Sequence, residues 1–265
     1  MEREAEARPA KEGKDAGPGE AFALTRDLVR VYCDESSQDQ RYMLISGLWV
    51  PAQAQPELDR RLADYRTRTG MVRHMKWKKV SGAKFEEYRD WVNLFFGFEG
   101  RLWLNALVLD QHQYPLGPDG DEELSFYKLY YQLLLHRLDP GKRYEIVLAQ
   151  RPTRKVDILT VLHQCLNAGM RKMYHLPQGT EVVRDLKSVP EESLDELQLV
   201  DVLMGAFGWA FNSRGDRENA RRAKVDLAAH IAHRLNQNDL VFQNGASNRP
   251  VSVWVFRGAT SAASR

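Results

Sequence analysis

Runs of apolar residues alternate with polar links along most of the chain. Short runs rich in β-branched and aromatic residues, each ended by polar residues, are typical of strands. They lie at 28–36, 41–50, 101–110, 144–149, 180–186 and 251–256. Apolar residues at helical spacing predict helices at 56–69, 83–98, 121–138, 153–173, 193–212 and 216–236. The short polar link SSQDQ between the first two strands predicts an antiparallel hairpin.

The order of these elements indicates the fold class. Three antiparallel strands followed by alternating strands and helices predict a mixed sheet with helices on both faces. With two extra helices between the second and third strands, the order is similar to that of the ribonuclease H core. We therefore expect one α/β domain at 27–257, with a ribonuclease-H-like mixed five-stranded sheet and a basic helical insertion at 53–100. Residues 1–26 and 258–265 have little to bury and are predicted to be disordered tails.

The composition is typical of a globular protein and argues against several classes. Of the 265 residues, 43% are hydrophobic, and the formal net charge is only +2. Any affinity for nucleic acid must therefore come from local basic patches. The two cysteines, Cys33 and Cys165, have no metal-ligand spacing, which argues against a disulfide framework and structural zinc and favours a reducing compartment. Since no apolar run is long enough to span a bilayer and the charged N-terminal segment lacks the apolar stretch of a signal peptide, we expect a cytoplasmic protein.

Two acidic residues end the first predicted strand, in a run that is otherwise apolar. Side chains of adjacent strand residues point to opposite faces of a sheet, so the carboxylates of Asp34 and Glu35 should diverge. We expect at most one of them, Asp34, to reach a shared centre directly. The alternative is that the sequence DESS begins an ordinary polar turn, where Asp and Ser are common.

A third acidic residue lies in a helix that is apolar on almost every side. Asp201 in LQLVDVLMGAF is therefore expected to be buried, and a buried carboxylate is costly unless it is paired, protonated or coordinated. Gln198 lies three residues earlier on the same helix face, and Gly205, four residues later, would let another backbone come close. A metal ligand and a core Asp bonded to Arg or to a strand end are both compatible with this pattern.

An acid at the end of the first strand and an acid on a late helix suit metal-dependent phosphoryl chemistry. Two-metal sites use carboxylates from separate elements that converge on cations about 3.5–4 Å apart. Oxygen ligands favour Mg²⁺ or Mn²⁺ over zinc. The sequence therefore predicts a site for Mg²⁺ or Mn²⁺ between Asp34 and Asp201.

Five segments of the chain resemble a bacterial family known as domain of unknown function 3800, whose members look like nucleases of ribonuclease-H-type fold. The segments are VYCDESS, ISGLWV, HMKWKKVS with the helix after it, FYKLYYQLLLHRL and LQLVDVLMGAFGWAFN, and they span 29–212. Their shared order and spacing make the resemblance specific. It implies that Asp34, Glu35 and Asp201 occupy acidic positions of the family.

The chain departs from the family pattern at two places. The family often has Glu where this chain has His74, and it usually ends the fourth strand with an acid in the pattern D-x-R, where this chain has Ala149-Gln150-Arg151. The departures leave open a degenerate member without catalytic activity. Candidates to replace the missing groups are Asp110 at the end of the third strand, Asp185 at the end of the fifth, and His74 as a ligand or proton shuttle.

A basic stretch lies next to the predicted acidic site. From Arg60 to Lys84 there are nine Lys or Arg residues and one acid, with Tyr65 and Trp77 among them. Lys and Arg neutralise phosphates, and an aromatic ring can stack on an unpaired base. The alternative is a solvated basic helix face, with Trp77 anchoring a loop in the core. We expect phosphate contacts from Lys76, Lys78, Lys79 and Arg151.

Two functions from different classes are compatible with these features. The first is a Mg²⁺- or Mn²⁺-dependent nuclease or related phosphodiester-processing protein acting on DNA or RNA, in which Asp34 and Asp201 bind metal and Glu35 assists catalysis. It rests largely on family analogy, and a fold alone does not define a function. The second is a catalytically inactive module of the same fold that binds nucleic acid or a protein partner, and the missing acid at Ala149-Gln150 favours it. A homo-oligomer is compatible with either.

Overall fold

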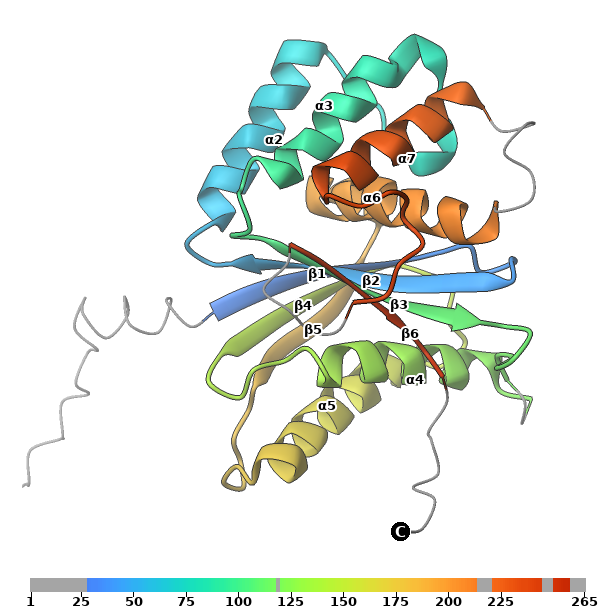
Figure 1. Cartoon of the computed structure of the whole chain (residues 1–265). Helices are drawn as coiled ribbons and strands as arrows, with labels where there is room; N and C mark the ends of the chain where they lie inside the picture. The colour runs from blue at the N-terminus through green and yellow to red at the C-terminus, as the bar shows by residue number, and fades with distance from the viewer. Residues whose placement is uncertain (1–27, 118–119, 214–220, 245–249, 258–265) are drawn as a thin grey trace, which may run out of the picture.

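Six strands form the central sheet of the part of the chain that the structure describes (Figure 1). They are β1 (Leu28–Ser36), β2 (Tyr42–Pro51), β3 (Trp103–Asp110), β4 (Arg143–Ala149), β5 (Val183–Val189) and β6 (Val251–Val255), in the order β5-β4-β1-β2-β3-β6. Neighbours among β1, β2 and β3 are antiparallel, while β4 is parallel to β1, β5 to β4 and β6 to β3. The first five strands form the predicted mixed sheet, and β6 extends it beside β3.

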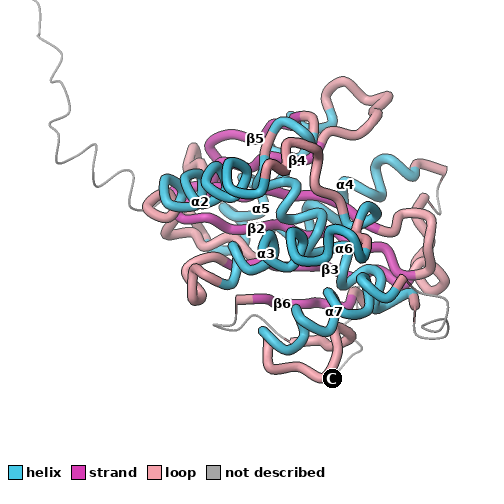
Figure 2. Tube along the Cα trace, turned by 90° about the horizontal axis from the view of Figure 1, so that it is seen from above, coloured by secondary structure: helices cyan, strands magenta, loops and turns pink. Residues whose placement is uncertain are grey.

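Helices cover both faces of this sheet. One layer holds α2 (Gln55–Thr69), α3 (Phe85–Phe96), α6 (Asp195–Asn212) and α7 (Arg222–Arg234), and the other holds α4 (Glu122–Leu135) and α5 (Ile158–Tyr174) (Figure 1, Figure 2). In the first layer, α6 lies directly on β1 and β2 and is itself covered by α3 and α7.

The computed structural model describes residues 28–117, 120–213, 221–244 and 250–257. The two predicted tails lie outside these ranges. Within them, no helix is long and apolar enough to cross a membrane.

Alternation along β1 divides its side chains between two apolar clusters. Val31 and Cys33 pack with the side chains of α4 and α5, whereas Tyr32 packs in the cluster that contains α6. Because successive strand residues point to opposite faces, Asp34 shares the α6 face with Tyr32, and Glu35 shares the α4 face with Cys33. The sheet therefore separates the two acidic neighbours, as the sequence predicts.

The α6 helix is apolar on nearly every side because it lies between the sheet and other helices. Residues 196–208 are all buried except Asp201, which is partly exposed. The prediction of a buried helix is thus confirmed for 196–208, although Asp201 itself, which the sequence predicts to be buried, keeps partial access to solvent.

The strand before α6 begins and ends later than predicted. The prediction at 180–186 is displaced by three residues, because β5 covers Val183–Val189. The side chain of Asn167 in α5 makes hydrogen bonds of 2.8 and 3.0 Å to the N–H groups of Val182 and Val183 and one of 2.9 Å to the carbonyl of Val183. These contacts tie the start of β5 to α5.

Two helices begin well after the predicted first residue. The α5 helix begins at Ile158 rather than 153, because Thr153 and Lys155 bind Glu123 and Asp121 at the start of α4. The α7 helix begins at Arg222, and the first residues of the prediction at 216–236 lie outside the described residues.

Candidate metal centre

The carboxyl ends of the parallel strands meet at one edge of the sheet. Near this edge β1 carries Asp34 and Glu35, and β5 is followed there by the short 3-10 helix η3 (Glu191–Ser193). Since β1, β4 and β5 run in the same direction, the residues after β5 lie on the side where β1 ends. The α6 helix starts directly after η3 and carries Asp201 across β1.

Three carboxylates converge at this edge and form the acidic cluster. Oxygen atoms of Asp34, Glu191 and Asp201 lie within 4.8 Å of one another. They come from β1, η3 and α6, which are three separate elements. Oxygens that bind one Mg²⁺ at about 2.1 Å can be up to about 4.2 Å apart, so movements of less than about 1 Å would bring all three within reach of one ion.

Burial and mutual repulsion control the ionisation of the acidic cluster. Asp34 is only 5% exposed, and burial, followed by the nearby charges of Glu35, Asp201 and Glu191, raises its pKa well above the usual range. Burial is also the main reason that the pKa of Asp201 rises to about 7, although the Trp77 N–H and the charge of Lys76 oppose this rise. A divalent cation would stabilise the ionised form of both acids.

One oxygen of Asp34 is the strongest single indication of a cation site. Oδ1 accepts a hydrogen bond of 2.8 Å from the backbone N–H of Glu35. Oδ2 is buried and has no hydrogen-bond partner among the described residues. A buried polar atom without a partner is costly, and coordination to a cation would satisfy it. The residues present therefore fit Mg²⁺ or Mn²⁺, which prefer carboxylate oxygens.

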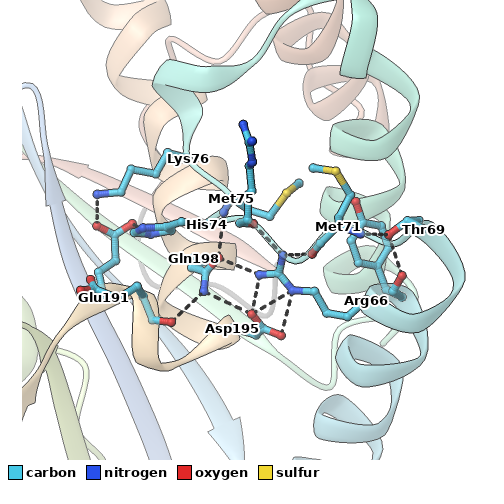
Figure 3. Close-up of polar contacts among 12 residues, drawn as sticks. Arg66, Thr69, Met71, His74, Met75, Lys76, Glu191, Asp195 and Gln198 are labelled. Atoms are coloured by element: carbon cyan, nitrogen blue, oxygen red, sulfur yellow. Dashed lines mark hydrogen bonds and ion pairs between the residues drawn. The ribbon is translucent and has the colours of Figure 1, made fainter.

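Residues 73–79, which we call the basic segment, pass α6 beside the acidic cluster. The backbone N–H of Trp77 donates to Asp201 Oδ1 at 2.7 Å. His74 Nε2 lies 2.7 Å from Glu191 Oε1, and Lys76 Nζ lies 2.5 Å from Glu191 Oε2 (Figure 3). Both oxygens of Glu191 are therefore in contact with the basic segment.

Gly205 allows this close passage. A Cβ atom at Gly205 would lie 2.3 Å from Cβ of Trp77, which is far inside van der Waals contact. Gly205 is one helical turn after Asp201 and lies on the same face of α6. The sequence predicts the approach of another backbone at Gly205; the nearest atoms are those of the Trp77 side chain, and the backbone N–H of the same residue donates the hydrogen bond to Asp201.

A polar network anchors the basic segment on α6 at a second point (Figure 3). Arg66 of α2 forms an ion pair of 2.5 Å with Asp195 and donates to Gln198 Oε1 at 2.7 Å. The same Gln198 oxygen accepts from the backbone N–H of Met75 at 2.8 Å. The basic segment is thus fixed at Met75 and at Trp77, on either side of Lys76.

Glu35 lies outside the acidic cluster. On the other face of β1, its Oε2 accepts a hydrogen bond of 2.8 Å from the hydroxyl of Tyr130 in α4. Burial raises the pKa of Glu35, and Tyr130 and Arg151 counteract this rise. Asp34 is thus the one of the two neighbours that reaches the shared centre, while the assisting role of Glu35 stays a prediction.

The four predicted phosphate contacts lie in different surroundings. Lys78 and Lys79 are exposed on the 3-10 helix η1 (Trp77–Lys79), whereas Lys76 meets a carboxylate. Arg151 follows β4 and stacks on Phe126, with its guanidinium carbon 3.5 Å from the ring centroid. Its Nη1 is buried and has no hydrogen-bond partner in the described part of the chain.

The two candidates for the missing acid lie away from the acidic cluster. Asp110 ends β3, two strands from β1, and its carboxylate forms an ion pair of 2.8 Å with Arg41, which lowers its pKa. Asp185 lies within β5 rather than at its end, because this strand extends to Val189. The structure brings neither into the cluster, and the third carboxylate there is Glu191.

Glu191 is the candidate ligand that sequence reasoning missed. The predicted strand at 180–186 ends too early, which leaves Glu191 in a polar link. The available signal was the sequence SVPEE, in which Pro190 ends the apolar alternation and two acids follow at once. Because β5 extends to Val189, Glu191 comes almost directly after the strand.

The strand order β3-β2-β1-β4-β5, with β4 and β5 parallel to β1 and helices on both faces, defines a ribonuclease-H-like α/β fold.

No protein-family model matches the chain, and no curated protein sequence is a significant match. Among solved structures, the chain is similar to ribonuclease H3 from Aquifex aeolicus, with 11% identity, a TM-score of 0.36, and coverage of 83% of this chain and 66% of that chain. It thus spans slightly less than two thirds of the ribonuclease H3 chain. It is also similar to ribonuclease HII from Archaeoglobus fulgidus, solved in a complex with PCNA, with 11% identity, a TM-score of 0.38, and coverage of 83% of this chain and 96% of that chain.

Proposed function

We propose that the protein is a nuclease or related phosphodiester-processing protein that depends on Mg²⁺ or Mn²⁺. The observation that carries this proposal is the convergence of Asp34, Glu191 and Asp201, with Oδ2 of Asp34 buried and unpartnered among the described residues. Carboxylate oxygens select these ions, and carboxylates from separate elements hold the ions of many phosphoryl-transfer sites. The resemblance to the domain of unknown function 3800 family points to the same class from the sequence.

The residues of the site have distinct roles in binding and orientation. Asp34, Glu191 and Asp201 would hold the ion, which when bound activates a water and neutralises charge on the phosphate. The N–H of Trp77 orients Asp201. His74 and Lys76 orient Glu191 from the basic segment.

Basic residues on both sides of the acidic cluster support a nucleic-acid substrate. Lys78 and Lys79 lie on η1 next to Trp77, whose N–H reaches the cluster. Arg151 lies on the other side, close enough to Glu35 to affect its pKa. Lys and Arg bind phosphates. Nucleic acid is a polyanion that an acidic cluster alone would repel, so positive charge is needed beside the cluster. We infer that nucleic acid lies across this edge of the sheet, between η1 and the end of β4.

Cleavage assays test the proposed function. Labelled single- and double-stranded DNA and RNA are incubated with the wild type, Asp34→Asn and Asp185→Asn, in Mn²⁺ and in EDTA. We expect Mn²⁺-dependent cleavage by the wild type and a loss of about 100-fold or more in Asp34→Asn, because one ligand of the ion is weakened. Asp185→Asn is the matched control, since this exposed carboxylate lies outside the acidic cluster. Cleavage that persists in EDTA or in Asp34→Asn contradicts the proposal.

The second candidate function is an inactive module that binds nucleic acid through the same surface. Two observations favour it: the Lys76 ammonium already neutralises Glu191, and β4 ends in Ala149-Gln150 without an acid. Such a module binds nucleic acid in EDTA with a steep salt dependence that Asp34→Asn leaves unchanged. Binding of this kind, with no cleavage of any substrate, would favour the module over the nuclease.

A further inference from the structure

Lys76 lies among carboxylates, although the other two lysines of the basic segment are exposed. Its Nζ is 2.5 Å from Glu191 Oε2, and its side chain is only 23% exposed. It also meets the charges of Asp201 and Asp34. Lys78 and Lys79, by contrast, are exposed. One lysine of this stretch is therefore held at the acidic cluster.

The backbone fixes Lys76 in this place. The N–H of Met75 donates to Gln198 at 2.8 Å, and the N–H of Trp77 donates to Asp201 at 2.7 Å. The N–H of Lys76 itself donates to the hydroxyl of Tyr88 at 3.3 Å. Because three consecutive N–H groups are engaged, the position of Lys76 is set by the fold rather than by a flexible side chain alone.

The formal charges of the acidic cluster and Lys76 balance with one divalent ion. The ionised carboxylates of Asp34, Glu191 and Asp201 carry three negative charges, and Lys76 carries one positive charge. The net charge of minus two would be balanced by the two positive charges of one bound Mg²⁺ or Mn²⁺. A second divalent ion would leave an excess of positive charge in a largely buried place, which is unfavourable.

The strand beside β1 adds no further carboxylate. In the parallel pair of β1 and β4, Leu148 lies opposite Cys33, so Ala149 is level with Asp34. The chain continues with Gln150 and Arg151. The site therefore lacks an acid from β4 and contains a cation from the basic segment.

We propose that the ammonium of Lys76 serves as the second cation of this site, so that the protein binds one divalent ion. This inference rests on the proposed function and deepens it. Lys76 then neutralises charge of the carboxylates, while Lys78 and Lys79 remain exposed and can bind phosphates. Glu191 then lies between the lysine and the ion and contacts both.

Mn²⁺ binding to the full chain tests this inference without an activity measurement. Mn²⁺ is titrated by calorimetry, and the bound ions are counted from the electron paramagnetic resonance of free Mn²⁺, for the wild type, Lys76→Gln and Lys78→Gln. Lys78 is the matched control because it lies in the same segment and is exposed. Circular dichroism and thermal unfolding check that each variant is folded.

We expect the wild type and Lys78→Gln to bind one ion with similar affinity. Lys76→Gln removes a positive charge a few ångströms from the ion, so it should bind a second ion, or bind the first at least about tenfold more tightly. Two ions in the wild type overturn the inference, as does a Lys76→Gln variant with one ion and an affinity within about threefold of the wild type. In both cases the metal site and the proposed function stand. A wild type that binds no Mn²⁺ overturns the inference and the proposed function together.

Discussion

Asp34 and Glu35 carry the same charge and are adjacent in sequence, yet β1 places them in different chemical surroundings. Asp34 joins two other carboxylates and keeps one oxygen buried without a partner among the described residues. Glu35 accepts a hydrogen bond from Tyr130 on the opposite face. This divergence could be predicted from the period of a strand alone. The partners of each side chain could not, because they come from residues far along the chain.

A buried acid outside the acidic cluster allows the effect of burial on a carboxyl pKa to be tested separately. Glu196 of α6 is 7% exposed and accepts a hydrogen bond of 2.7 Å from Gln55. Burial, and then the neighbouring Asp59, raise the pKa of Glu196 to about 7, and a hydrogen bond shared with Asp59 favours the protonated form. Glu196 is therefore expected to be neutral in acid and to carry a poorly solvated charge above pH 7.

The Glu196→Gln variant should be more stable than the wild type in base and equally stable in acid. Because the folded pKa lies above the ordinary value of 4.5, the favourable contribution of Glu196 is complete below about pH 4.5 and is lost as the pH rises through 7. Gln keeps the shape and can donate to Asp59 at any pH. We expect the free energy of unfolding in urea to rise by about 2 kcal/mol at pH 8.5 and to stay unchanged at pH 4. An equal effect at both pH values would contradict the assigned pKa.

At the scale of elements, α6 and the basic segment form one unit. The segment has no regular structure except η1, and it is ordered by the contacts of Met75 and Trp77 with Gln198 and Asp201. Helical periodicity predicts α6, and Gly205 predicts that a backbone passes close to it. The identity of that backbone is not encoded locally, since the basic segment lies more than a hundred residues earlier in the chain.

Gly205→Ala should disturb the acidic cluster without touching any ligand. The new Cβ would lie 2.3 Å from Cβ of Trp77, so the basic segment must move and the hydrogen bond to Asp201 must lengthen. We expect a loss of about 1–3 kcal/mol in the free energy of unfolding and Mn²⁺ binding that is weaker by about tenfold or more. Urea unfolding and calorimetry measure the two effects.

Gly208→Ala is the matched control on the same helix. The nearest atom to its new Cβ is the hydroxyl oxygen of Ser37, at 2.7 Å, and a hydroxyl can rotate away. This variant should bind Mn²⁺ as the wild type does. Equal loss of Mn²⁺ binding in both variants would mean that α6, and not the passage of Trp77, accounts for the effect.

At the scale of the whole molecule, the sheet with two helical layers could be predicted because its patterns are local. Apolar alternation identifies strands, helical spacing identifies helices, and their order along the chain indicates a mixed sheet. The complete site could not be predicted, because the convergence of acids depends on strand order and strand ends. Glu191 follows β5, which is two strands from β1, and only the turn through η3 into α6 brings it back to Asp34.

The placement of charge over the molecule leads to a prediction about nucleic-acid binding. Lys78 and Lys79 lie in the layer of α6, whereas Lys128 and Lys172 are exposed on α4 and α5, in the opposite layer. The double variant Lys78→Ala/Lys79→Ala should weaken binding and reduce the slope of log K against log salt concentration by about 1–2, since each phosphate contact adds roughly 0.7–0.9. Fluorescence anisotropy at several salt concentrations measures the slope. If Lys128→Ala/Lys172→Ala reduced the slope as much, the binding surface would not be the one we propose.

We propose above all that Asp34, Glu191 and Asp201 together hold a divalent ion. Anomalous scattering from Mn²⁺ in a crystal of the protein tests it most directly, because it locates the ion without reference to activity. We predict one anomalous peak within about 2.5 Å of an oxygen atom of each of the three carboxylates. A peak held by other residues, or no peak at this edge of the sheet in saturating Mn²⁺, would contradict the claim.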